Sequence, residues 1–258
     1  VDLSARDKLI VVRIDEDERG FVVTVRQFDT RTRLWDAVRE RATPQRDQLP
    51  FVAWDLVRQS FAPILRVERI QDSNIQARVR AGGLVVNPTE NPAAVQPGDA
   101  LQPILRRNDR TGEPAKIAGI SLAPWSAIHV DERAEAVISG TMFSGVRFPL
   151  PSRGGVRTER LAVKINPRLP TTRLVVESKS AERQPLEGYE VYSKLPGAEN
   201  AQLLGRTDWQ GGFVVPLRES ALQVLYVRSG GKLLARLPLV VGSLEEAPVR
   251  LVDDQQRL

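Results

Sequence analysis

Three residue types that could form a hydrolytic centre stand close together in the chain, at Ser126, His129 and Asp131. In such a centre the serine would be the nucleophile, the histidine the base and the aspartate the residue that orients the base. His129 is the only histidine, so any histidine-dependent catalysis would have to use it. The surrounding segment is typical of a β-strand, in which His129 and Asp131 share a face while Ser126 points to the other. The spacing therefore predicts no local triad, and we interpret His129 as a strand residue beside a hairpin acid.

A second pattern, Asp15-x-Asp17-x-Arg19-Gly20, imitates the start of a calcium-binding loop. Arg19 stands where such a loop needs an oxygen ligand, and Arg26 stands where it needs a bidentate glutamate, so a hairpin turn is favoured. The chain has no cysteine, which excludes disulfides, thiol nucleophiles and cysteine-ligated metals. It also lacks the glycine-rich motifs of common nucleotide-binding loops. We expect no enzyme, no cofactor and no metal site, although a pair of carboxylates from distant segments would leave no local signature and stays an open alternative.

The best candidates for contacts with a partner are arginines in polar loops and one tryptophan in a turn, since exposed arginine and tryptophan are frequent anchors of protein interfaces. One group of arginines is expected at a basic loop tip and another in a glycine-rich stretch. The candidate residues are Arg106, Arg107, Arg110, Arg153, Arg157, Arg160 and Trp209.

The positive charge is spread thinly over the chain. The net charge is +5 and the isoelectric point about 9.9. Dividing the chain at residues 81 and 166 gives an excess of +2, +2 and +1 in successive segments. Proteins that bind nucleic acid usually concentrate basic residues on one module or stripe. We therefore expect no specific nucleic-acid binding, only a weak attraction to polyanions that salt removes.

Residues 1–81 are expected to form a small α+β domain of the order β-β-β-α-β-β. The first strand carries apolar residues on both faces, which suggests burial on both sides, and a polar turn closed by Gly20 joins it to the second. The helix is expected between Pro50, which suits a first helical turn, and Pro63, which ends it. The expected elements of this domain are strands at 8–15, 21–28 and 33–41, a helix at 51–61, and a hairpin with strands at 64–70 and 75–81.

The sequence pattern changes after residue 82, where helical periodicity disappears and proline becomes frequent. Short strands separated by turns predict a small SH3-like β-barrel over 82–166, with an arginine-rich loop. About seven short strands predict an Ig-like β-sandwich over 167–258. The fold class is therefore multi-domain and mostly β.

Two resemblances to known families accompany these patterns. The segment Pro185-Leu186-Glu187-Gly188-Tyr189-Glu190-Val191-Tyr192, followed by Thr207-Asp208-Trp209-Gln210-Gly211-Gly212-Phe213, resembles the carboxypeptidase-regulatory-like and transthyretin-like sandwiches. That resemblance implies an Ig-type fold, which mostly serves as a spacer or adhesion domain.

The first two modules resemble the flagellar assembly protein T of the bacterial periplasm. The shared features are the α+β unit ending at 75–81 and the turn Val95-Gln96-Pro97-Gly98-Asp99 that opens a barrel. The resemblance implies a non-catalytic ring-building protein. This chain departs from that family by carrying the Ig-like module and by lacking the family's own N-terminal domain.

We therefore expect a non-enzymatic structural or assembly protein of the cell envelope that binds other proteins or itself. The alternative is a carbohydrate-binding or adhesion module that uses Trp125, Trp209 and Tyr192 as stacking faces. A periplasmic or extracellular location is expected from the module types and from the start at Val1, because a cleaved signal peptide would explain it, as would trimming or a missing segment. No apolar run is long enough to span a membrane.

Overall fold

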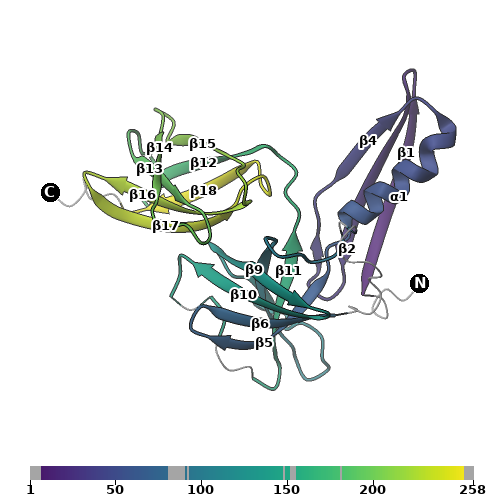
Figure 1. The fold of residues 1–258 in the computed structure, drawn as a ribbon, viewed down its shortest axis with the longest axis horizontal. Helices are drawn as coiled ribbons and strands as arrows, with labels where there is room; N and C mark the ends of the chain where they lie inside the picture. The colour runs from purple at the N-terminus through teal and green to yellow at the C-terminus, as the bar shows by residue number, and fades with distance from the viewer. Residues whose placement is uncertain are drawn as a thin grey trace.

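The structure, a computed structural model, describes residues 7–80, 91, 93–147, 149–151, 155–180 and 182–252. It is mostly β, as expected, and its strands form several sheets, one of which closes into a six-stranded barrel (Figure 1). The residues that precede the barrel project from it as an arm, here defined as residues 8–61. No helix in the described part of the chain is long and apolar enough to cross a membrane.

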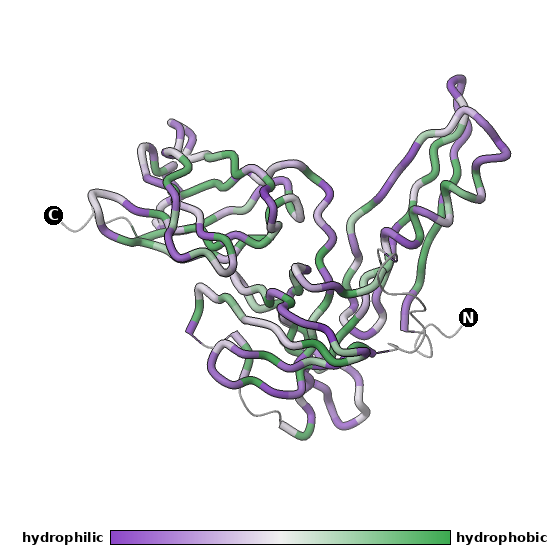
Figure 2. Tube along the Cα trace, in the orientation of Figure 1, coloured by the Kyte–Doolittle hydropathy of each residue, from purple (hydrophilic) through white to green (hydrophobic). Residues whose placement is uncertain are grey.

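The arm consists of one antiparallel sheet and the helix that covers part of it. Its strands are β1 (Lys8–Asp17), β2 (Gly20–Asp29), β3 (Leu34–Trp35) and β4 (Arg39–Thr43). β2 lies in the middle, pairing with β1 on one side and with β3 and β4 on the other. The single strand expected over 33–41 is wrong, because the pairing with β2 stops between β3 and β4. The turn between β1 and β2 forms the hydrophilic tip of the arm (Figure 2).

A short 3-10 helix (Arg46–Gln48) leads into α1 (Leu49–Ser60), which confirms the expected helix. Pro50 lies in its first turn, where the missing N–H costs no hydrogen bond. Val52 and Leu56 fall four residues apart on one face and pack against Val23 and Val25 of β2. The arm therefore has its own small core between α1 and the middle of the sheet.

The barrel follows α1 directly. Its strands are β5 (Ile64–Gln71), β6 (Asn74–Val79), β7 (Ala100–Arg107), β9 (Ser126–Ala134), β10 (Val137–Ser144) and β11 (Thr158–Ile165), with β8 (Ile120–Leu122) added outside β7. The order β11-β5-β6-β10-β9-β7 closes because β11 also pairs with β7. The turn at 96–99 that opens β7 is present, and the Asp99 carboxylate accepts the Gln96 N–H at 2.6 Å.

The hairpin β5–β6 corrects the expected α+β layer. We expected it to lie with the helix and the first strands, but it pairs with β10 and β11 of the barrel. The alternation itself is as expected, since Ile75, Ala77 and Val79 are buried while Arg78 is exposed. Those three side chains join the barrel core, because α1 already occupies the apolar face of the arm sheet.

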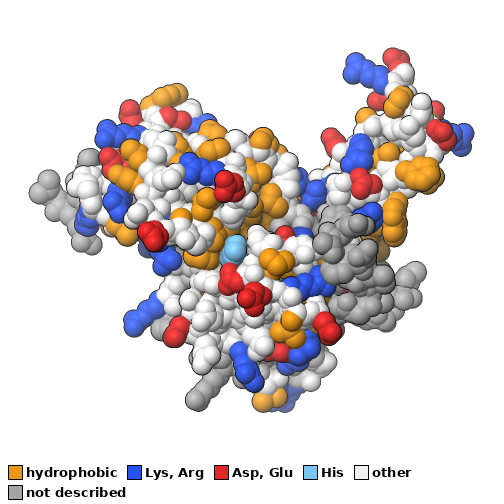
Figure 3. All heavy atoms as spheres, in the orientation of Figure 1, with side chains coloured by type: hydrophobic (Ala, Val, Ile, Leu, Met, Phe, Trp, Pro, Cys, Tyr) orange, Lys and Arg blue, Asp and Glu red, His pale blue; other side chains and the backbone are white. Residues whose placement is uncertain are grey.

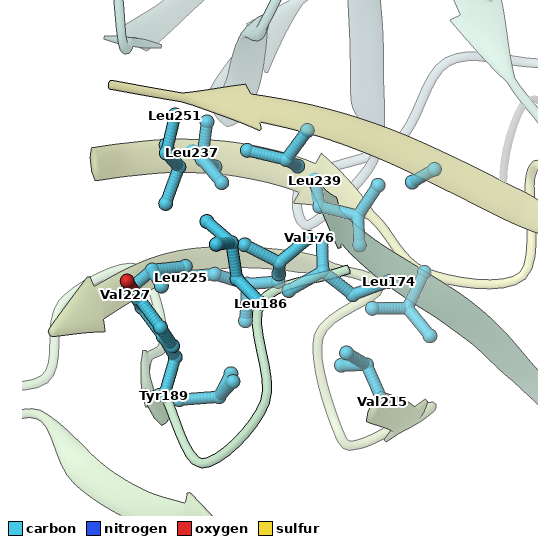
Figure 4. Packing of buried hydrophobic residues seen from close by; sticks show 14 residues of the cluster. Leu174, Val176, Leu186, Tyr189, Val215, Leu225, Val227, Leu237, Leu239 and Leu251 are labelled. Carbon is cyan, nitrogen blue, oxygen red and sulfur yellow. The ribbon is translucent and has the colours of Figure 1, made fainter. Parts of the chain in front are cut away.

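The last part of the chain forms two sheets that pack face to face. One contains β15 (Gly212–Pro216), β12 (Thr171–Ser178) and β18 (Glu246–Leu251); the other contains β14 (Gln202–Arg206), β13 (Glu190–Lys194), β16 (Leu222–Ser229) and β17 (Lys232–Val240). β12 and β18 run parallel, whereas every other neighbouring pair is antiparallel. Leu174 and Val176 of one sheet face Leu225 and Leu239 of the other across a shared core (Figure 4). We refer to this part as the sandwich.

Candidate protein-binding surfaces

Trp209 occupies the turn between β14 and β15 and is 72% exposed. The turn is held by Asp208, whose side-chain Oδ1 accepts the N–H groups of Gln210 at 2.9 Å and Gly212 at 2.7 Å. Its backbone also exchanges hydrogen bonds with the far side of the turn. The backbone on either side of Trp209 is therefore fixed while its indole faces solvent.

Two neighbours tie this turn to the body of the sandwich. Gly211 has a φ of +71°, and a Cβ at this position would lie 2.3 Å from the Val176 carbonyl oxygen, so only glycine fits without strain. Thr207 donates its hydroxyl to the Leu186 carbonyl at 2.6 Å and accepts the Tyr189 N–H. The sequence segment that suggested a sandwich turn thus forms a rigid support for one exposed aromatic ring.

Arg106, a candidate contact, lies in β7 and is only 4% exposed. Its guanidinium donates to the Arg31 carbonyl and the Asn108 side chain, each at 2.7 Å, and to the Gly112 carbonyl at 3.1 Å. Arg31 belongs to the turn after β2, and it forms an ion pair with Glu159 of β11. Arg106 is therefore a buried residue of the barrel that links it to the arm through a hydrogen bond.

The carboxylate of Glu159 is the centre of this junction. Its Oε1 also accepts a hydrogen bond from Asn108 Nδ2 at 2.6 Å. Burial by itself raises the pKa of Glu159, but the hydrogen bonds from Arg31 and Asn108, together with the charge of Arg106, lower the pKa below its ordinary value. Burial, with the charge of Arg31, lowers the pKa of Arg106. The junction therefore favours an ionised Glu159.

Most of the other candidate arginines lie along the paired strands β7 and β11 or in the loops next to them, and the Asn108 N–H donates to the Arg157 carbonyl at 2.7 Å. Arg107, Arg110 and Arg157 are exposed. Arg160 is half-buried, and its guanidinium donates to the backbone carbonyls of Pro151 and Glu68. Arg153 lies outside the described residues.

His129 and Asp131 share a face of β9, as the alternation predicts. His129 Nδ1 lies 2.9 Å from Asp131 Oδ1, and the Thr141 hydroxyl donates to Asp131 Oδ2 at 2.7 Å. The Ser126 hydroxyl is engaged elsewhere, with Ser144 at 2.8 Å and the Pro124 carbonyl at 3.0 Å. The structure therefore does not bring Ser126 to the histidine. No group of three or more potential metal ligands is found among the described residues.

The three aromatic residues considered for stacking lie on separate elements. Trp125 precedes β9, packs against the sandwich core and lines a pocket of about 240 Å³ between the barrel and the sandwich. Tyr192 lies in β13, where the Arg228 guanidinium stands 4.8 Å from its ring centroid. Of these three residues, only Trp209 offers a largely exposed ring.

A second exposed aromatic surface was not predicted from the sequence. Phe51 and Trp54 lie on the outer side of α1 and are 75% and 64% exposed. Figure 3 shows hydrophobic side chains on the side of the arm where α1 lies. The helical period could have found them, because both positions fall off the stripe defined by Val52 and Leu56.

Comparison with known proteins gives no family assignment. No protein-family model and no curated protein matches the chain. Among solved structures, the Bacillus anthracis TIE protein aligns over 82% of this chain and 46% of its own length, with 8% identity and a TM-score of 0.26. This chain thus spans less than half of that protein. TolB from Acinetobacter baumannii aligns over 94% of this chain and 83% of its own, with 14% identity and a TM-score of 0.18.

Proposed function

We propose that this chain is a non-enzymatic structural or assembly protein of the cell envelope that binds other proteins or itself. The observation that carries the proposal is Trp209, an indole 72% exposed on a turn whose backbone is fixed by Asp208, Thr207 and Gly211. A large aromatic ring on a preorganised turn loses little conformational entropy on binding, which is the property of an interface anchor.

Within this proposal the sandwich is of the Ig type found in carboxypeptidase-regulatory-like modules, and the barrel is of the SH3-like kind used in flagellar assembly protein T. Such modules position binding loops on rigid sheets. A periplasmic or extracellular location is part of the same proposal.

The test is capture of partners from the envelope fraction of the source organism with the immobilised full chain. We expect Trp209→Ala to lower the yield of at least one specific partner by roughly tenfold or more, as loss of an anchor residue does. Leu203→Ala is the matched control, because Leu203 is 55% exposed in the neighbouring strand β14 and lies outside the turn.

Equal capture by the wild type and Trp209→Ala would contradict the proposal. Binding of a glycan array that depends on Trp209, without any protein partner, would instead support the carbohydrate-binding alternative, in which the indole stacks on a sugar face.

A further inference from the structure

The strand β1 forms a free edge of the arm sheet. Among the described residues it pairs only with β2. Asp17 and Gly20 flank a two-residue loop and form a hydrogen-bonded pair, so the odd-numbered residues of β1 bond to β2. The Thr30 N–H donates to the Asp7 carbonyl, which agrees with this parity. The even-numbered residues from Lys8 to Glu16 therefore direct their backbone N–H and C=O groups outward.

The apolar face of the sheet is partly exposed to solvent at this same edge. Val12 stands opposite Val25, and Ile14 stands opposite Val23. Val23 and Val25 are fully buried beneath α1, whereas Val12 and Ile14 are 43% and 49% exposed. The row of buried side chains therefore stops at β1. Within the described chain, neither the outward backbone N–H and C=O groups of this strand nor its exposed apolar side chains have a partner.

The helix borders this uncovered strip. Asp55 of α1 forms an ion pair with Arg41 of β4, so the opposite flank of the helix, which carries Ala53 and Val57, lies toward β1. Trp54 lies three residues before Val57, next to it on the solvent side of that flank. The strip thus combines an open strand edge with exposed aliphatic and aromatic side chains, which together offer more area than a strand edge alone.

We propose that β1 pairs in an antiparallel manner with β1 of a second copy of this chain. This inference rests on the proposed function, of which it names one partner. In such a pair, an even-numbered residue of one β1, whose backbone N–H and C=O point away from β2, must stand opposite an even-numbered residue of the other β1. The arm sheets of two copies then join into one sheet, with both α1 helices on the same face.

The register with Val12 opposite Val12 of the second copy pairs the apolar side chains of this edge best. Ile10 then faces Ile14 of the second copy, and the reverse, so every central pair on the helix side is apolar. Lys8 faces Glu16, although the Lys8 ammonium already binds Asp29 and the Ala62 carbonyl, so this position contributes backbone pairing.

Charge disfavours the parallel direction. The acidic end of the strand, Asp15-Glu16-Asp17-Glu18, would lie beside its equivalent in a parallel pair and repel it. In the antiparallel pair the two acidic ends lie at opposite ends of the seam. A two-fold arrangement is also the commonest form of self-association, because one patch serves both subunits.

The absence of cysteine from the chain makes a direct test possible. Val12→Cys would bring two thiols onto directly opposed residues, at a separation that a disulfide can bridge. Val11→Cys is the matched control, because Val11 is 44% exposed but faces the other side of the sheet and stands opposite Arg13 in this register. We expect mild oxidation to convert full-length Val12→Cys into a covalent dimer at least tenfold faster than Val11→Cys. Equal rates would overturn the register.

Sedimentation of the full chain over a wide concentration range gives the independent measurement. We expect a monomer–dimer equilibrium that Val12→Lys weakens by at least tenfold, because two like charges would meet at the two-fold axis, while circular dichroism stays unchanged. A monomer at all concentrations would overturn self-pairing. A monomer that still captures a partner through Trp209 would leave the proposed function standing. A β1 dimer without Trp209-dependent capture would support self-pairing and contradict the proposed binding of other proteins.

Discussion

The arm and the barrel are built from the same kind of strand but leave very different surfaces. Val130 in the barrel is fully buried, whereas Val12 in the arm is 43% exposed, although the apolar residues on both faces of its strand predict burial. The two regions differ in whether the sheet closes on itself. The six barrel strands form a ring in which each has two neighbours, while the arm sheet ends at β1. An apolar residue in a strand is therefore buried by what lies beside the strand, not by its own pattern.

The largest expected effect is in the barrel core. Leu101 is fully buried among Leu65, Ile128 and Val130. We expect Leu101→Ala to lower the free energy of unfolding by about 3 kcal/mol, because it removes apolar contacts and leaves a cavity. Val12→Ala in the arm should cost less than about 0.5 kcal/mol in dilute monomer. Urea denaturation followed by circular dichroism measures both losses, and similar values would show that closure of the barrel does not decide how much a buried strand residue contributes.

A smaller effect is expected where the arm joins the barrel. We expect Glu159→Gln to cost about 1–2 kcal/mol, because Arg31 loses its charged partner in a partly buried network. Glu113→Gln is the control, since its ion pair with Arg33 is more than half exposed on both sides and should contribute little. Thermal denaturation at neutral pH measures the difference. If the two variants behave alike, the junction does not couple the two regions.

The pH dependence of the same carboxylate should show a still smaller difference. The pKa of Glu159 is lower in the folded protein than its ordinary value, so ionised Glu159 stabilises the fold above the pKa of the unfolded chain. That contribution is lost as the pH falls through the lowered pKa. We therefore expect the gap in melting temperature between wild type and Glu159→Gln to shrink as the pH falls from neutral into the acid range. A gap that is constant or grows would show that Glu159 is not held in its ionised form.

Much of the secondary structure could be predicted from the sequence. The alternation of Ile75, Ala77 and Val79 gave the correct buried face of β6, and the prolines at 50 and 63 bracketed α1 correctly. The separation of Ser126 from His129 also followed from alternation alone. These features depend on residues near one another in the chain, whose geometry a period of two or of 3.6 residues describes.

Which strands pair, and which side chains are covered, was decided only by the tertiary structure. The hairpin β5–β6 could have extended the arm sheet, and its place in the barrel depends on β10 and β11, far along the chain. Arg106 and Trp209 were equal candidates in the sequence, yet the first is buried under Arg31 and the second is exposed on a rigid turn. Local periodicity determines which way a side chain points from its strand, but burial depends on what a distant segment places opposite it, and that information lies in no single stretch of the sequence.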